Sequence, residues 1–188
     1  QLVALNTVSN LVQVVREQIE IDASMSSLSV DVTPLRDGGS GTKAYAEAVS
    51  VYLGLAVSKS AVFLNTQARW RAGESKTAPA FGRQSIPMVW DYAEVNPFAG
   101  AGGDFQGVVN GAASVLDRLR GHASGQLINH DAQTVTYPSN TVISSDPPYY
   151  DNIGYADLSD FFFCWMKPVL RPVFPEIFGV LATPKAEE

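Results

Sequence analysis

A short strand-like run that ends in a proline-rich corner constrains the fold of this chain more than any other feature. The β-branched run Thr141–Ile143 is followed by two serines and then by Asp146-Pro147-Pro148-Tyr149. Such a run is typical of a buried parallel strand. Each proline fixes its own φ and keeps the residue before it out of the helical region, so the strand ends in a stiff, extended turn. Ligands of open α/β sheets bind beyond the carboxyl ends of the strands, and the pattern therefore predicts an α/β fold with a site at this corner.

The corner carries groups that suit a flat heterocycle with an amino group. The Asp146 carboxylate and the Pro147 carbonyl oxygen can both accept hydrogen bonds from one exocyclic amino nitrogen. The Tyr149 ring offers a surface on which the heterocycle can stack. Catalysis would then depend on positioning and charge complementarity rather than on a strong base. The alternative is a proline turn whose tyrosine is packed for stability alone.

The same residues carry a family resemblance. The tetrapeptide resembles motif IV of the amino-methyltransferases that use S-adenosylmethionine, chiefly the adenine-N6 class. The longer stretch Asp146–Phe163 is similar to one branch, the large adenine-specific DNA methylases associated with a zinc ribbon. The resemblance extends through Phe81–Gln84, Pro87–Asp91 and Thr183–Glu187. It implies a partial Rossmann-like methyltransferase core, preceded here by a helical segment, and methylation of DNA from S-adenosylmethionine, as in restriction-modification.

The resemblance also assigns roles to individual residues. The Asp-Pro-Pro-Tyr corner would be catalytic, and the DNA base would be swung out of the duplex to reach it. Tyr150 and Asn152 would line the base pocket, although a surface loop that satisfies its own backbone is the alternative. Asp131, followed by Ala132, resembles the acidic residue of motif III, which lies beside the cofactor adenine. A simple turn aspartate is the other interpretation of Asp131.

A second glycine-rich segment, Asn96–Gly103, resembles the motif I loop that holds the methionine part of the cofactor. Its position argues against that role. Three right-handed crossovers of about 30 residues each must separate motif I from motif IV, and only about 43 residues lie between Gly103 and Asp146. Asn96 also replaces the aspartate of that motif. We therefore predict a glycine-rich helix start with Asp104 near the N-cap, and an isolated chain without methylation activity.

Hydrophobic periodicity indicates a helical part, residues 1–80. The resemblance implies that residues 81–188 are the partial methyltransferase core that carries the motif. Helices are expected over the first twenty-odd residues, over 44–65, from Asp104 to a stop near Gly121, and over 156–170 with a break or a kink at Pro168. Residues 24–41 and 73–79 are expected to be a loop and a polar connector. Residues 126–129 and 134–137 are expected to be extended.

The charge of the chain bears on its partners. The net charge is −6, whereas a domain that grips nucleic acid by itself is usually basic. Either the DNA-binding surface lies elsewhere in a longer polypeptide or nucleic acid is not the substrate. We expect the first, with this chain as an internal segment that works with the remainder of the methylase polypeptide. Methylation of RNA or of cytosine N4, and a catalytically inactive interaction module, are the competing functions.

One basic cluster is interleaved with aromatic residues. It comprises Arg69, Arg71, Lys76 and Arg83 around Trp70 and Phe81. Such a cluster can follow a nucleic-acid backbone, but a solvated connector is the commoner explanation. The apolar run Phe161–Phe163 predicts a packed helix face, part of which could pair with a second copy of the chain.

The remaining features exclude several classes of protein. The single cysteine, Cys164, excludes an internal disulfide and suits a reducing cytoplasm. His122, His130 and Cys164 do not have the spacing of a zinc site, so any zinc ribbon lies outside this chain. No apolar run approaches the roughly 20 residues of a membrane span. Cys164 stands between Phe163 and Trp165 and is expected to be in the core.

Overall fold

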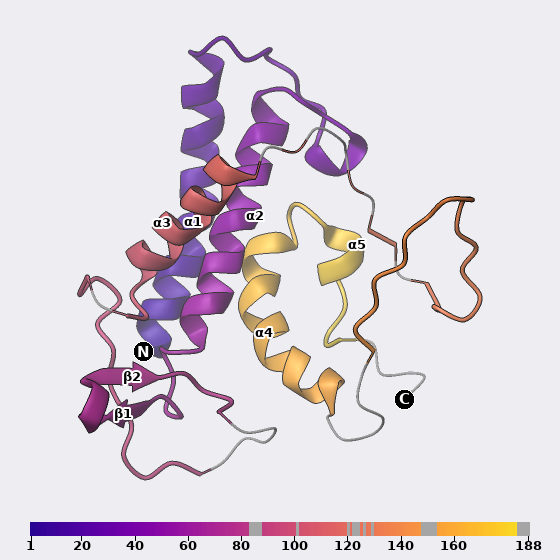
Figure 1. Ribbon diagram of the computed structural model, residues 1–188. Coiled ribbons are helices and arrows are strands. Elements are labelled where there is room, and N and C mark those ends of the chain that lie inside the picture. The colour runs from indigo at the N-terminus through magenta and orange to yellow at the C-terminus, as the bar shows by residue number, and fades with distance from the viewer. Residues whose placement is uncertain are drawn as a thin grey trace.

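The computed structural model is helical, with one small β-hairpin (Figure 1). It describes residues 1–82, 88–100, 102–119, 121, 125, 127–128, 130–147 and 154–183. The α-helices are α1 (Leu2–Ser24), α2 (Thr42–Ala61), α3 (Phe105–Arg118), α4 (Tyr155–Leu170) and α5 (Pro175–Phe178). Two 3₁₀ turns, η1 (Leu35–Asp37) and η2 (Ala72–Glu74), and two strands, β1 (Arg69–Arg71) and β2 (Lys76–Ala78), complete the elements.

Helices α1 and α2 form an antiparallel hairpin that lies side by side along its length (Figure 1). Leu5 and Val12 of α1 recur at helical spacing and are buried against α2. The loop between the two helices is tied to the start of α2 by two contacts. The Thr42 N–H donates to the Ser29 carbonyl oxygen at 3.0 Å, and the Leu35 N–H donates to Glu47 Oε2 at 2.7 Å. The predicted helices and the predicted loop between them are confirmed.

Helix α4 completes the core by packing against α2. Gly54 permits the close approach, because a Cβ atom at this position would lie 2.9 Å from Leu170 Cδ2 and 3.1 Å from Val169 Cγ1. The buried cluster joins α1, α2, α4 and α5 through Val12, Val57, Phe163, Val169, Leu170 and Phe178. Pro168 lies in the last turn of α4, where the helix continues to Leu170 and does not break as predicted.

The hairpin β1–β2 occupies the region in which a polar connector was expected. Its strands are antiparallel, and the pairs are Arg69 with Ala78, Trp70 with Thr77, and Arg71 with Lys76. Residues Ala72–Glu74 form the 3₁₀ turn between the strands. Ala78 and the nearby Ala68 and Ala80 are buried, so the hairpin is anchored on the lower end of the α1–α2 pair (Figure 1). The expected connector over residues 73–79 thus includes the end of the 3₁₀ turn and the second strand of this hairpin.

The predicted fold class, a partial Rossmann-like α/β core, is wrong. The described residues contain one two-stranded antiparallel sheet, and no parallel strand pair occurs among them. Residues 141–147 have no regular secondary structure, and Val142 and Ile143 are 92% and 66% exposed. Their β-branched side chains favour a strand, but a strand needs a hydrogen-bonded neighbour, and the described part of the chain provides none. Residues 134–137 likewise form no strand.

Candidate functional site

The predicted catalytic corner lies at the end of an exposed segment. Residues 130–147 run outside the helices, in the orange part of Figure 1, and Asp146 and Pro147 are both exposed. The other predicted residues of the corner and of the base pocket, Pro148, Tyr149, Tyr150 and Asn152, lie outside the described residues. The structure therefore gives the position of the Asp146 carboxylate, which is predicted to be catalytic, and the start of the helix that follows the corner.

That helix, α4, is hydrogen-bonded to the last described residue of the chain, Thr183. Asp160 Oδ1 accepts hydrogen bonds from the backbone N–H of Thr183 at 2.9 Å and from its hydroxyl at 2.5 Å. The same hydroxyl oxygen lies 3.1 Å from the carbonyl oxygen of Ala156. Thr183 is thus fixed against the first turns of α4.

A third segment reaches the same helix through aromatic contacts. The ring centroid of Phe81 lies 4.9 Å from that of Phe161 in an edge-to-face arrangement, and 5.6 Å from that of Phe162. Such ring pairs contribute about 0.5–1.5 kcal/mol beyond the area they bury. Phe81 has a φ of 58°, in the left-handed region that a bulky residue rarely adopts. The packing against α4 offsets the cost of this backbone conformation.

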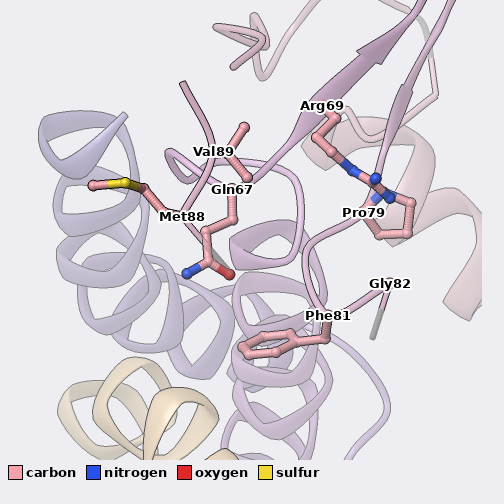
Figure 2. Close-up of a pocket in the computed structure, with 7 residues that line it drawn as sticks. All are labelled: Gln67, Arg69, Pro79, Phe81, Gly82, Met88 and Val89. Atoms are coloured by element: carbon pink, nitrogen blue, oxygen red, sulfur yellow. The ribbon is translucent and has the colours of Figure 1, made fainter. Parts of the chain in front are cut away.

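A pocket of about 170 Å³ lies beside Phe81, between the hairpin and the following loop (Figure 2). Its lining residues come from three short segments and are Gln67, Arg69, Pro79, Phe81, Gly82, Met88 and Val89. Figure 2 shows the Gln67 amide, the Arg69 side chain and the Phe81 ring around one space. The basic and aromatic residues that the sequence placed in a solvated connector are therefore partly gathered around a cavity.

The charges near the pocket are distributed unevenly. Arg71 Nη1 lies 3.1 Å from Glu74 Oε1, and Lys76 forms a second ion pair with the same carboxylate. Lys76 and then Arg71 hold the pKa of Glu74 below its usual value. Arg69, in contrast, has no acceptor among the residues that the structure describes. Two of the three cations of the hairpin thus share one carboxylate, and the third, Arg69, lines the pocket.

The predicted cofactor contacts Asp131 and Ala132 lie in an exposed turn. Asp131 Oδ1 accepts from the Gln133 N–H at 2.9 Å, and the Asp131 carbonyl oxygen accepts from the N–H groups of Thr134 and Val135, both at 3.1 Å. These hydrogen bonds are all local. The structure does not bring Asp131 into contact with Phe81 or α4 through any described hydrogen bond.

The glycine-rich segment before α3 is a helix start, as predicted for Asp104. Asp104 Oδ1 accepts from the Gly107 N–H at 2.7 Å, and Oδ2 accepts from the Gly100 N–H at 2.8 Å. Asp104 is 5% exposed and is the N-cap residue of α3. Gly103 has a φ of 94° and packs so closely on Phe63 that a Cβ atom would lie 2.9 Å from Phe63 Cγ. The N-cap prediction is confirmed.

Within the described ranges, no three His, Cys, Asp or Glu side chains gather in a group that could hold a metal ion. Cys164 is exposed, so its predicted place in the core is wrong. Its Sγ donates to the Phe161 carbonyl oxygen of the same helix at 3.0 Å. Partial burial raises the pKa of the Cys164 thiol, and the negative charge of Asp160 adds to the effect.

Comparison with protein-family models, with curated proteins and with solved structures gives no match for this chain. No helix in the described part of the chain is long and apolar enough to cross a bilayer. Any assignment of function therefore depends on the residues of this chain themselves.

Proposed function

We propose that this chain is the motif-bearing part of an S-adenosylmethionine-dependent methyltransferase that acts on the N6 amino group of adenine in DNA. The observation that carries the proposal is the eighteen-residue stretch Asp146–Phe163, in which the Asp-Pro-Pro-Tyr corner leads directly into the apolar start of α4. A match of four residues could arise by chance. A match that continues through the loop and into the helix is far more specific.

The arrangement around α4 supports the proposal. Four stretches carry the resemblance, and residues of three of them meet on this helix: Phe81 packs on Phe161 and Phe162, and Thr183 is bonded to Asp160. Residues that act at one site must be held together by the fold, even when they are far apart in the sequence. They meet on the helix that follows the corner in the sequence, which is compatible with a shared site.

The roles of the corner follow from the chemistry of an aromatic amine. Its nitrogen lone pair is delocalised into the ring, so the amine is a weak nucleophile. The Asp146 carboxylate and the Pro147 carbonyl oxygen would accept its two N–H groups and keep the lone pair directed outward, while Tyr149 would stack on the base. The nitrogen gains a methyl group and loses one proton. Tyr150 and Asn152 would complete the base pocket.

S-adenosylmethionine would supply the methyl group. The described residues around Asp131 and Ala132 form an exposed turn and not an enclosed cradle for this cofactor. We therefore assign the main cofactor contacts, together with the basic surface that holds DNA, to the remainder of the methylase polypeptide. Asp131 and Ala132 stay predicted contacts of the cofactor adenine.

The decisive experiment uses the full-length protein with methyl-labelled S-adenosylmethionine, mixed DNA and RNA. We expect label in DNA, recovered as N6-methyladenine after digestion to nucleosides. Asp146→Ala should abolish the incorporation, whereas Asp117→Ala, which removes an exposed aspartate of α3, should leave it unchanged. Label in N4-methylcytosine or in RNA would identify a different amino-methyltransferase. Equal activity of the Asp146→Ala variant and the unmodified protein would refute the role of the corner.

A further inference from the structure

Helix α1 carries two apolar stripes, and only one of them is covered. Leu5 and Val12 belong to the first stripe and are buried against α2. The second stripe, here called the outer seam, comprises Ala4, Thr7, Leu11, Val14, Gln18, Ile21 and Met25. None of these seven residues is buried, and Leu11, Val14, Ile21 and Met25 are 51%, 60%, 55% and 75% exposed. The solvent side of α1 is therefore an apolar surface without a cover.

The spacing of the outer seam is that of a coiled-coil heptad. Its residues follow one another at alternating intervals of three and four positions, which keeps them on one side of a helix. Position a is taken by Ala4, Leu11, Gln18 and Met25, and position d by Thr7, Val14 and Ile21. The pattern extends over three heptads, the length from which it indicates a coiled coil. We propose that the outer seam pairs α1 with α1 of a second copy of this chain, in antiparallel orientation.

An antiparallel pair matches the seam with itself when its two-fold axis lies between Leu11 and Val14. In such an isologous contact each residue meets its counterpart twice, once from each copy. The opposing pairs are Leu11 with Val14, Ala4 with Ile21, and Thr7 with Gln18. A small side chain thus meets a large one, and a polar side chain meets a polar one. Gln18 Nε2 donates to Asp22 Oδ1 at 2.8 Å, and Gln18 Oε1 can accept from the Thr7 hydroxyl of the second copy.

The charges beside the seam favour this orientation over a parallel one. Glu17 precedes a seam residue and Asp22 follows one, so they take the flanking positions g and e. A parallel pair would place Glu17 of each copy beside Asp22 of the other, and like charges at these positions disfavour the pairing. In the antiparallel pair Glu17 lies near Asn10, and Val8 lies near Val15. No two carboxylates then face each other across the seam.

The charges of α1 also favour a protein helix over a lipid surface as the occupant. A helix that lies on a membrane carries lysine and arginine on its polar face. Arg16 is the only cation of α1, and the helix has three carboxylates, Glu17, Glu20 and Asp22. The outer seam itself contains no charged residue, so two chains of net charge −6 can meet there without like charges in contact.

The apolar surface continues from the seam into a groove. Val8 and Val15 of α1 line this groove together with Phe98 and Phe105 at the start of α3, and its volume is about 250 Å³. Phe98 is 70% exposed. Apolar and aromatic side chains of this kind are typical of the centre of an interface. The contact between two copies can therefore extend beyond the seam to the entry of α3.

Sedimentation equilibrium of this chain over a range of concentrations tests the association. We expect monomers in dilute solution and dimers as the concentration rises, because one pair of helices buries less surface than a standard-sized interface. Val14→Glu should raise the dissociation constant at least about tenfold, since it places a carboxylate in an apolar contact. Val115→Glu is the matched control, because Val115 is 53% exposed on α3, and its effect should stay within about twofold. Circular dichroism checks that both variants keep their helices.

Disulfide cross-linking tests the orientation. Ala4→Cys and Ile21→Cys are made as separate variants in a Cys164→Ser background, which removes the only native thiol. In the antiparallel pair Ala4 lies opposite Ile21, within reach of a disulfide. Two Ile21 residues are about 25 Å apart along the helix axis at 1.5 Å per residue. We expect a mixture of the two variants to yield the mixed cross-linked dimer, identified by its mass, and each variant alone to stay uncrosslinked.

Three results would overturn the proposal: a monomer at every concentration up to about 1 mM, equal effects of Val14→Glu and Val115→Glu, or cross-linking of Ile21→Cys with itself. The inference goes beyond the proposed function, because the pairing of α1 requires no reaction at Asp146. Methylation by a chain that stays monomeric, or a dimer without methylation, would each separate the failure of one proposal from that of the other.

Discussion

Thr183 is bonded to Asp160 through both its backbone N–H and its hydroxyl, across 23 positions of the sequence. Both hydrogen bonds end on the same carboxylate oxygen, Oδ1, and both are partly buried. A carboxylate that accepts two donors in this way makes a stronger contact than a neutral acceptor would. The pair fixes the segment after α5 to the beginning of α4, directly downstream of the predicted catalytic corner.

Thr183→Val is expected to destabilise the protein. Valine keeps the shape of threonine and removes the hydroxyl, so one charge-assisted hydrogen bond is lost while the backbone bond remains. The free energy of unfolding, measured by urea denaturation, should fall by about 1–2 kcal/mol. Thr7→Val, on the exposed side of α1, is the matched control and should change it by less than about 0.5 kcal/mol. Equal effects of the two substitutions would show that the bond to Asp160 contributes no stability.

The N-cap of α3 offers a second test. Asp104→Ala removes acceptors for two backbone N–H groups, those of Gly100 and Gly107, in a buried position. We expect a loss of about 2 kcal/mol in the free energy of unfolding, together with reduced helicity by circular dichroism. Asp104→Asn keeps one side-chain oxygen as an acceptor and should lose less. A larger loss for asparagine than for alanine would contradict the capping role.

The helices could be predicted from the sequence because their signals are local. Leu5 and Val12 recur with the period of a helix, and Asp104 is a side chain that caps the helix after it. Both signals depend on residues within a few turns of one another. The observed bounds of α1, α2, α3 and α4 differ from the predicted ones by a few residues, which is the usual uncertainty at helix ends.

The sheet could not be predicted because strand formation depends on distant partners. Val142 and Ile143 have the side chains of a buried strand and are exposed in the structure. Arg69-Trp70-Arg71, with two charged residues in three, does form a strand, because Lys76–Ala78 returns beside it through a tight turn. Propensity marks where a strand is possible, whereas pairing decides where one forms. The same limit applies to the pocket, whose lining residues are separated by up to 22 positions, from Gln67 to Val89.

The predicted site residues Asp131 and Asp146 show a related limit of prediction from sequence. Asp146 and Asp131 were both chosen from their position after an extended run, yet the structure places both in exposed segments with no packed surroundings. The pocket beside Phe81 contains Gln67, which no sequence pattern marked. An amide becomes informative once its oxygen is known to be buried without a donor, and that is a property of the fold and not of the sequence.

Two glycines in helices should respond in opposite directions to substitution. Gly54 lies where α2 meets α4, so Gly54→Leu forces side-chain atoms into Leu170 and Val169 and should destabilise the protein by about 1–3 kcal/mol. Gly111 lies in α3 with no heavy atom within 4 Å of the position of a Cβ. Gly111→Ala should therefore stabilise it by about 0.5–1 kcal/mol through the higher helix propensity of alanine. Urea denaturation of both variants measures the change in the free energy of unfolding. A change of the same sign in both variants would contradict the close packing of α2 on α4 at Gly54.

Cys164 provides a prediction about pH. Partial burial, and to a lesser extent the charge of Asp160, raise the pKa of this thiol above its usual value near 9.0. The raised pKa means that the folded state disfavours the thiolate. The contribution of the Cys164 thiol to the free energy of unfolding is therefore present below its usual pKa, and it is lost as the pH rises through the folded-state pKa. The rate of alkylation by iodoacetamide should consequently reach half its maximum at a higher pH in the folded protein than in urea. Asp160→Asn should lower that midpoint, and an unchanged or higher midpoint in this variant would remove Asp160 as a cause.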